Sequence, residues 1–263
     1  MTISFVGAGP GAPDLITLRG AQRLSAAEVV VWAASLVPAE LLDHCAPGVV
    51  VHDSKRMTHD EVCAVYAAHQ DAAIVRLHSG DTSIYSAIGE QVAWCRANDR
   101  EFEVVPGVTS VAATAAAAGC ELTVPGLSQT IVMTRMARRT SASMPPNESL
   151  ASAAAAGGTL ALFLSIGHVR ELVEELVHGE AALDPATPVV AGHRVSWADE
   201  QIVRTTLDGL VEAVADAGFD AATMLLIGPA LAVADPPRRS HVYASAYATR
   251  FRAASAKGDR AAR

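Results

Sequence analysis

Short apolar runs rich in β-branched residues alternate with helix-like segments along the first half of the chain. The segments Leu15–Ala27 and Thr58–His69 have helical spacing, and the second begins with a capping box formed by Thr58 and Glu61. Strands that alternate with helices predict a parallel sheet with right-handed crossovers. The predicted strands are Ile3–Val6, Val29–Trp32, Val49–His52, Ile74–Leu77 and Phe102–Val105.

The pattern is interrupted at Pro125-Gly126, and a second set of apolar strands follows. These strands are expected at Thr130–Thr134, Thr159–Leu164, Val189–Ala191 and Met224–Ile227, with helices at about 148–156, 168–178 and 207–217 between them. We therefore predict two α/β domains, residues 1–124 and 125–252. The small, charged stretch 253–263 is predicted to be a disordered tail.

Composition and charge exclude several classes of protein. The 263 residues are 51% hydrophobic, which is typical of a globular protein with a substantial core. No uncharged apolar run reaches the length of a membrane span, and no signal peptide precedes the first strand, so we expect a cytoplasmic protein. The 20 basic and 28 acidic residues argue against a nucleic-acid partner. The four cysteines and nine histidines lack metal-ligand spacing, and we predict no metal site.

Three glycine-containing turns follow predicted strands of the first half. They are Gly7-Ala8-Gly9-Pro10-Gly11, Gly80-Asp81-Thr82-Ser83-Ile84-Tyr85 and Val105-Pro106-Gly107-Val108-Thr109-Ser110. In open α/β sheets, ligands bind at the carboxyl ends of the strands. Glycine lets a ligand approach the backbone, and free amides and carbonyls offer directional hydrogen bonds. The three turns together predict a cleft for a small molecule, although each is also consistent with an ordinary capped helix start.

The first turn formally matches a dinucleotide fingerprint, Gly7-x-Gly9-x-x-Ala12. A nicotinamide site also needs an acidic residue at the end of the second strand, where this chain has Val31-Trp32-Ala33-Ala34. Pro10 and Pro13 remove two backbone donors from a loop that would have to bind pyrophosphate. A nicotinamide-dependent oxidoreductase is therefore an enzyme hypothesis that this fingerprint supports only weakly.

Two polar runs are the other candidates for chemistry. The densest basic cluster contains Arg135, Arg138 and Arg139 and follows a strand, where it could bind substrate carboxylates or form a solvated surface. The run from His193 to Glu200 follows another strand and is also consistent with an exposed turn that carries an aromatic residue. No hydrolase motif surrounds Ser196.

These motifs together resemble the tetrapyrrole (corrin/porphyrin) methylases, which use S-adenosylmethionine. The resemblance spans nearly the whole chain to about Arg252. A narrower resemblance, to the members that methylate precorrin-4 at C11 in cobalamin biosynthesis, rests on three further segments. These are Phe163-Leu164-Ser165, Arg194-x-Ser196-Trp197-x-Asp199-Glu200 and Tyr243-x-x-x-Tyr247-x-x-Arg250-Phe251-Arg252.

The resemblance implies a homodimer of two-domain chains with the cofactor in a cleft between the domains, one with a mainly parallel five-stranded sheet and the other with a mixed sheet. It implies methyl transfer by in-line displacement without a metal, and it identifies no catalytic base. Precorrin-4 or its cobalt form would be the substrate, and a related tetrapyrrole methylase is the enzyme alternative. A non-catalytic tetrapyrrole carrier is the alternative outside enzymes. The expected cofactor contacts are Pro10, Gly80, Asp81, Ile84, Thr109, Ser110, Leu164, Ala191, Gly192, Gly228 and Pro229. The expected substrate contacts are Gly9, Gly11, Arg135, Arg138, Arg139 and Arg194.

Overall fold

The computed structural model describes residues 1–136, 144–145, 147–232 and 240–255, so most of the predicted tail over 253–263 lies outside the described residues. The chain divides into two units. The first comprises Met1–Gly119, Ala191–Val203 and Phe219–Met224, and the second comprises the rest. The domain boundary expected between residues 124 and 125 stays a prediction.

The first unit contains a parallel five-stranded sheet, as the sequence predicts. Its strands are paired in the order β3-β2-β4-β1-β5, and every recorded pair is parallel. The central strand β1 pairs Ile3 with Ile74 on one side and with Phe102 on the other. The strands are β1 (Ile3–Gly7), β2 (Val29–Trp32), β3 (Val50–Asp53), β4 (Ile74–His78) and β5 (Phe102–Val105).

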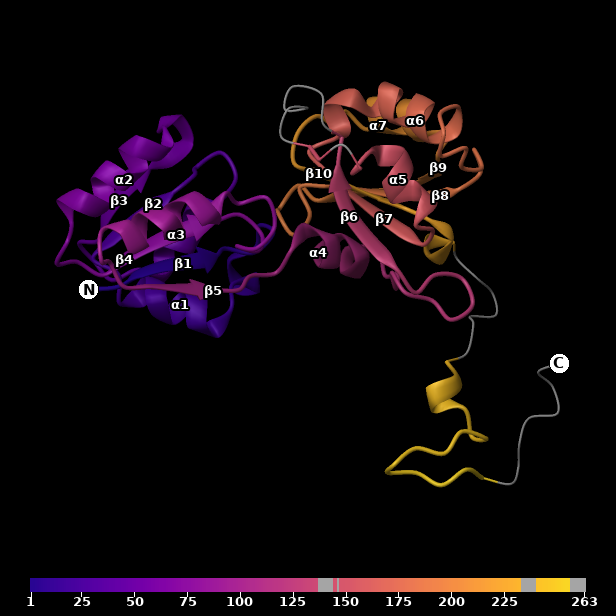
Figure 1. Cartoon of the computed structure of the whole chain (residues 1–263), viewed down its shortest axis with the longest axis horizontal. Coiled ribbons are helices and arrows are strands. Elements are labelled where there is room, and N and C mark those ends of the chain that lie inside the picture. Colours follow the sequence, from indigo (N-terminus) through magenta and orange to yellow (C-terminus); the bar gives the residue numbers. More distant parts are fainter. Residues whose placement is uncertain (137–143, 146, 233–239, 256–263) are drawn as a thin grey trace. The chain divides into compact units, whose positions relative to one another are not determined.

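Helices cover both faces of this sheet (Figure 1), namely α1 (Leu18–Ser25), α2 (His59–Ala68) and α3 (Ile88–Ala97). Leu24 of α1 packs with Val6 and Leu77 on one face. Tyr66 of α2 packs with Phe5 on the other, in a cluster that also includes α3. The chain therefore leaves β1 toward one face and the neighbouring β4 toward the opposite face. Such a point in the strand order opens a crevice where α/β proteins bind ligands.

Side-chain caps set where the first two helices begin. The hydroxyl of Thr58 accepts a hydrogen bond from Glu61 N and the Glu61 carboxylate accepts one from Thr58 N, which confirms the predicted capping box. Helix α1 begins at Leu18, later than the predicted Leu15, because Thr17 caps Gly20 N. The residues before it, Pro13–Leu15, form a separate 3-10 turn.

The second sheet has the strand order β6-β7-β10-β8-β9 and is mixed, because β6 and β7 are parallel and β7 and β10 are antiparallel. Strand β9 was not predicted. It is an edge strand with Gln201, Arg204 and two threonines, and its polar residues hide the alternation that would mark it. The strands are β6 (Ile131–Arg135), β7 (Thr159–Phe163), β8 (Pro188–His193), β9 (Gln201–Thr206) and β10 (Thr223–Ile227).

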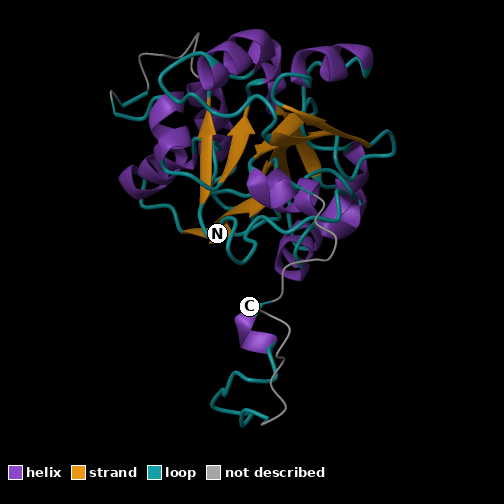
Figure 2. Cartoon of the chain, turned by 90° about the vertical axis from the view of Figure 1, so that its right-hand side faces the viewer, coloured by secondary structure: helices purple, strands orange, loops and turns teal. Residues whose placement is uncertain are grey.

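The remaining elements are mostly short. Four further helices are α4 (Ser110–Ala117), α5 (Leu150–Ala155), α6 (Val169–Val177) and α7 (Leu210–Asp216). Residues 240–255 form loops with one 3-10 turn, His241–Tyr243 (Figure 2). In the described part of the chain, no helix has both the length and the apolar character needed to cross a membrane. Further 3-10 turns within the described residues are Ala39–His44, Ser54–Arg56, Ile166–His168 and Pro229–Leu231.

Candidate functional site

The turns that follow β1 and β4 are joined to each other through their backbones. Gly9 N donates to Gly80 O at 3.1 Å, and Gly80 N donates to Gly9 O at 2.8 Å. Both glycines have left-handed backbone conformations, with φ of 81° at Gly9 and 66° at Gly80. Residues with a Cβ rarely adopt such angles, so this reciprocal pair depends on glycine at both positions.

The third turn packs against the first two at backbone distance. A Cβ atom at Gly107 would lie 2.8 Å from Gly7 Cα and would overlap the carbonyl oxygen of Gly80. A Cβ atom at Gly7 would lie 2.6 Å from Gly107 Cα. The three turns that the sequence places at strand ends therefore form one constellation, and its close contacts are made by backbone atoms.

Asp81 links the second turn to the third. Its Oδ2 accepts a hydrogen bond from Gly107 N at 2.7 Å, and its Oδ1 accepts from Ser83 N at 2.8 Å and from the Ser83 hydroxyl. Partial burial raises the pKa of the Asp81 carboxyl, but the bonds from Ser83 and Gly107 together outweigh it and lower the pKa. The carboxylate of this predicted cofactor residue is thus engaged in holding the turns.

The constellation retains backbone groups that a ligand could bind. Among the described residues, no protein acceptor receives a hydrogen bond from Asp81 N or Thr109 N. A Cβ atom built on Gly80 would meet nothing closer than Thr109 Cα at 4.0 Å, so a ligand can approach the backbone there. Thr109 caps Val111 N at the start of α4, directly before Ser110. The structure therefore brings together four predicted cofactor residues, Gly80, Asp81, Thr109 and Ser110. A fifth, Ile84, lies in the same turn as Asp81 and donates its N–H to Asp81 O at 3.3 Å.

The turn between β8 and β9 contacts the first glycine loop within the same unit. Trp197 Nε1 donates to the carbonyl oxygen of Pro10 at 3.0 Å, and Ser196 Oγ accepts from Ala12 N at 2.9 Å. The sequence marked this segment as a polar run after a strand and as part of the family resemblance, but neither periodicity nor spacing pairs it with residues 10–12. Arg194, a predicted substrate contact, pairs with Asp199 at 2.7 Å, and its guanidinium lies 4.2 Å from the centre of the Trp197 ring.

Strand β8 carries two further predicted cofactor residues, Ala191 and Gly192, both buried. A Cβ atom at Gly192 would lie 2.7 Å from Thr114 Cγ2, so the α4 side chain packs directly on this backbone. The adjacent His193 bonds Thr223 Oγ1 through Nδ1 at 3.0 Å and stacks on Phe219 with ring centres 4.8 Å apart. These contacts agree with a structural role for this histidine.

The other predicted site residues belong to the second unit or lie outside the described residues. Leu164 is 73% exposed with a left-handed φ of 53°, an unusual state for a leucine. Gly228 and Pro229 mark the start of a 3-10 turn after β10. Arg135 ends β6, whereas Arg138 and Arg139 fall in the undescribed stretch. A cofactor cleft that combines both units stays a prediction.

A polar pair at the end of β4, the buried His78 and the partly buried Arg76, was not predicted. The carbonyl of His78 accepts a hydrogen bond from Ala8 N at 2.7 Å, which places this residue next to the first glycine loop. Its side chain is buried against Phe5, and its Nε2 has no partner among the described residues. Burial, followed by the charge of Arg76, lowers the pKa of His78 to about 3. The sequence signal that could have revealed this pair is the alternation within β4, because residues two apart in a strand, such as Arg76 and His78, lie on one face.

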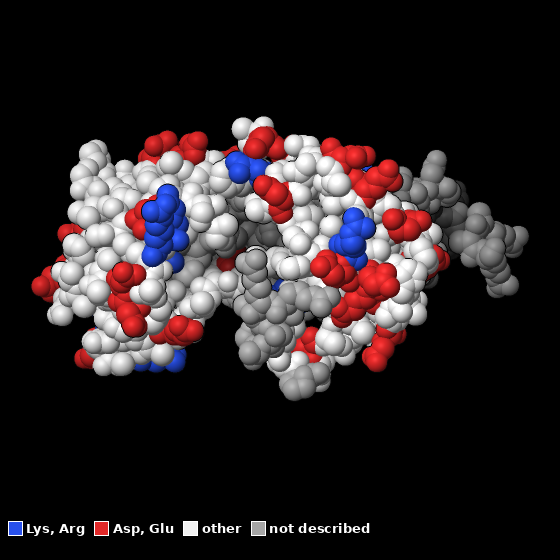
Figure 3. All heavy atoms as spheres, turned by 90° about the horizontal axis from the view of Figure 1, so that it is seen from above, with Lys and Arg blue, Asp and Glu red and all other residues white. Residues whose placement is uncertain are grey.

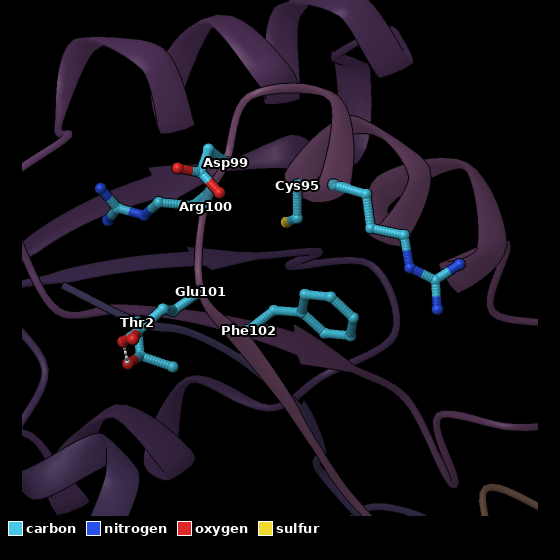
Figure 4. Close-up of a pocket in the computed structure, with 7 residues that line it drawn as sticks. Thr2, Cys95, Asp99, Arg100, Glu101 and Phe102 are labelled. Carbon is cyan, nitrogen blue, oxygen red and sulfur yellow. Dashed lines mark hydrogen bonds between the residues drawn. The ribbon is translucent and has the colours of Figure 1, made fainter.

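A cavity of about 540 Å³ opens at the opposite edge of the first sheet (Figure 4). It lies between the end of α3 and the start of β5, and Glu101 bonds the Thr2 hydroxyl there at 3.3 Å. None of its lining residues belongs to the glycine turns. Two arginines and two acidic residues line the cavity, so it carries no net charge that would favour a charged ligand. We therefore place the candidate site at the glycine turns and not at this cavity.

Charged side chains of both signs are scattered over one face of the molecule (Figure 3). On the face shown in Figure 3, basic side chains stand singly among more numerous acidic ones. A nucleic-acid partner would require a continuous basic surface. The described residues on this face do not form one.

Comparisons with known proteins identify the family. The family model of the tetrapyrrole (corrin/porphyrin) methylases matches residues 2–211. A precorrin-4 C(11)-methyltransferase from Sinorhizobium sp is 41% identical over 254 residues, which are 96% of this chain and 98% of the relative. A solved structure of a cobalamin biosynthetic enzyme, cobalt precorrin-4 methyltransferase, has a TM-score of 0.84 at 38% identity and covers 88% of this chain and 96% of its own.

A second solved structure adds a bound ligand. It is a uroporphyrin-III C-methyltransferase from Thermus thermophilus in complex with S-adenosylhomocysteine, with a TM-score of 0.71 at 26% identity, and it covers 88% of this chain and 99% of its own. The family model spans most of the chain, and the Sinorhizobium relative is matched almost from end to end. The chain therefore belongs to the tetrapyrrole (corrin/porphyrin) methylases.

Proposed function

We propose that this protein is an S-adenosylmethionine-dependent C-methyltransferase that acts on a corrin precursor, precorrin-4, at carbon C11. The observation that carries the proposal is the constellation of Gly9, Gly80 and Gly107 at the carboxyl end of a parallel sheet, with open amides at Asp81 and Thr109. It occurs in a chain matched over 96% of its length by a precorrin-4 C(11)-methyltransferase.

The residues present suit the expected cofactor. S-adenosylmethionine supplies a methyl group that its sulfonium centre already activates. The open space above Gly80 admits a ligand to the backbone, and the amides of Asp81 and Thr109 can donate to its polar groups. The cofactor carries no phosphate, which agrees with a first loop that has Pro10 and Pro13 in place of two donors. Pro10, Ile84 and Ser110 complete the contacts that we propose for this unit. Leu164, Ala191, Gly192, Gly228 and Pro229 are the contacts proposed elsewhere.

The protein's part in the reaction would be alignment. A rigid backbone frame holds the reacting groups at attack distance, which can contribute several kcal/mol to catalysis. The first glycine loop, with Gly9 and Gly11 buried in its backbone, would face the tetrapyrrole. Arg135, Arg138 and Arg139 would bind its carboxylates, because guanidinium groups pair with carboxylates in bidentate geometry. Arg194, whose Nε already donates to Asp199, would offer only its remaining donors. His193 is bonded to Thr223 and stacked on Phe219, so we assign it no role as a base.

Calorimetric titration with S-adenosylhomocysteine, with NAD in parallel, tests the cofactor class. We expect saturable binding of S-adenosylhomocysteine alone, and binding of NAD alone would refute the proposal. Incubation with S-adenosylmethionine and precorrin-4 should then give a product heavier by one methyl group, located at C11 by NMR. Turnover of only the cobalt form would assign the protein to that substrate. Tetrapyrrole binding without methyl transfer would indicate a carrier.

A homodimer is proposed on the family resemblance, and light scattering of the purified chain tests it. Twice the mass of 27.3 kDa is expected across micromolar concentrations. A concentration-independent monomer would refute this part of the proposal without affecting the proposed reaction. The cytoplasmic location expected from the sequence likewise stays a prediction, and fractionation of the source cells tests it.

A further inference from the structure

The turn between β8 and β9 holds the first glycine loop through two hydrogen bonds that span the sequence. The Ser196 hydroxyl accepts from Ala12 N at 2.9 Å, and the Trp197 indole donates to Pro10 O at 3.0 Å. The partners are 184 and 187 residues apart in the chain. Both ends of the segment 10–12 are thereby attached to one turn.

Packing reinforces these two bonds. A Cβ atom at Gly11 would overlap the Trp197 indole and would lie 2.9 Å from Ser196 Oγ. The loop backbone therefore lies directly on the indole, and Gly11 itself is buried. On its other side the loop is joined to Gly80 by the reciprocal bonds of Gly9. The loop is fixed from two directions.

The turn that holds the loop is itself strained and braced. Arg194 and Ser196 both have left-handed backbones, with φ of 45° and 71°. Such strain persists only where surrounding contacts impose it, and it clusters at functional sites. Here Arg194 pairs with Asp199 at 2.7 Å and stacks on Trp197, and Ser196 N donates to Glu200 Oε2 at 2.6 Å. A simple connection between two strands would not need this bracing.

We propose that Ser196 and Trp197 are positioning residues that set the first glycine loop for the tetrapyrrole substrate, with Arg194 bracing the indole. The inference rests on the proposed function, in which the first glycine loop faces the substrate. Both residues act through the loop backbone. Their loss should weaken productive binding of the tetrapyrrole far more than binding of the cofactor, because Pro10 is the one proposed cofactor contact on this loop and the others lie elsewhere.

Two conservative substitutions separate this role from packing. Trp197→Phe keeps an aromatic ring beneath Gly11 and removes the indole donor. Ser196→Ala removes the acceptor for Ala12 N and keeps the Cβ atom in the strained turn. Trp94→Phe is the matched control, because Trp94 lies on α3 against Tyr66, away from the loop. We expect each site variant to lower kcat/KM for the tetrapyrrole about tenfold, the effect of one hydrogen bond. The double variant should lower it thirtyfold or more.

The cofactor titration and hydrogen exchange complete the test. The dissociation constant for S-adenosylhomocysteine should stay within about threefold of the wild-type value in every variant, and Trp94→Phe should leave kcat/KM unchanged. The Ala12 amide should exchange at least tenfold faster in Ser196→Ala, with exchange in β1 unaltered. Unchanged kcat/KM in the site variants, or an equal loss in Trp94→Phe, would overturn the inference.

Failure of the proposed function is a separate result. It would appear as a wild-type protein that does not methylate the tetrapyrrole. The exchange rate of Ala12 still decides in that case whether the turn fixes the loop. Wild-type exchange in Ser196→Ala would refute the inference whatever reaction the protein catalyses.

Discussion

Replacing His78 should reduce the protein's sensitivity to mild acid. The side chain is 6% exposed at the end of β4, with its ring centre 6.1 Å from that of Phe5. Burial and the neighbouring Arg76 disfavour the charged imidazolium, which lowers the pKa to about 3 from an ordinary value of 6.5. The folded protein therefore holds this histidine neutral across the range in which an unfolded chain protonates it.

The magnitude follows from proton linkage. Because the folded-state pKa is depressed, the unfolded state binds more protons between pH 6.5 and about 3. Stability is complete above the ordinary pKa and is lost as the pH falls through this window. At pH 5 the loss from this one residue is about 2 kcal/mol, and at pH 3 it is roughly 4 kcal/mol. Against a total stability of about 5–15 kcal/mol, the loss at pH 5 is readily measured.

Urea unfolding at pH 7.5 and pH 5.0 tests this directly. At pH 5.0 the carboxylates with lowered pKa values, such as Asp81 and Glu103, remain ionised and add little to the change. His78→Phe should lose about 2 kcal/mol less between the two pH values than the wild type does. Phe5→Leu is the matched control, because it perturbs the same ring contact without removing a titrating group and should lower stability equally at both pH values. An equal pH-dependent loss in His78→Phe and the wild type would show that this histidine is not held neutral, and the reasoning would fail.

Three further substitutions test the constellation of turns. Gly107→Ala should destabilise the fold by about 3 kcal/mol in urea unfolding and abolish S-adenosylhomocysteine binding, because the new Cβ atom would overlap Gly80 O. Gly89→Ala is the control and should do neither, because no atom lies within 4 Å of the position its Cβ atom would take. Asp81→Asn should cost about 1.5–3 kcal/mol and weaken that binding in calorimetry, because an amide cannot accept from both Ser83 and Gly107. Thr58→Ala removes the α2 cap and should cost about 1 kcal/mol in urea unfolding with binding unchanged. If Thr58→Ala weakened S-adenosylhomocysteine binding as much as Asp81→Asn does, loss of stability alone would explain the weaker binding in both variants.

Much of the fold could be predicted because its local signals agree. The strands of the first sheet are β-branched runs bounded by glycine, proline or polar turns, and Thr58 with Glu61 marks a helix start in the sequence itself. The strand order was beyond reach, since no local pattern specifies that β4 lies between β2 and β1. Strand β9 was missed because an edge strand can remain polar on both faces.

The candidate site was predictable in composition and unpredictable in geometry. Each glycine turn could be located from the strand before it, but the reason for each glycine lies in a different turn. Gly107 has no room for a side chain because of Gly80 and Gly7, which are distant in sequence. Likewise, Gly11 is constrained by Trp197, nearly two hundred residues later. A motif considered one turn at a time carries no such information, and so the first loop formally matched a dinucleotide fingerprint that its sequence context argued against.

A site assembled from backbone atoms also affects which experiments are informative. Its close contacts are made by amides, carbonyls and Cα atoms, and its one carboxylate is engaged in holding two turns together. Alanine substitution of exposed polar residues would therefore miss most of the machinery, since the groups that align a ligand have no side chain to remove. Substitutions that add a Cβ at a glycine, or that free one end of a loop, change the alignment directly. If alignment is the protein's main contribution, these variants should lose turnover far more than variants at any candidate base, and His193→Gln, which can retain a bond to Thr223, should lose little.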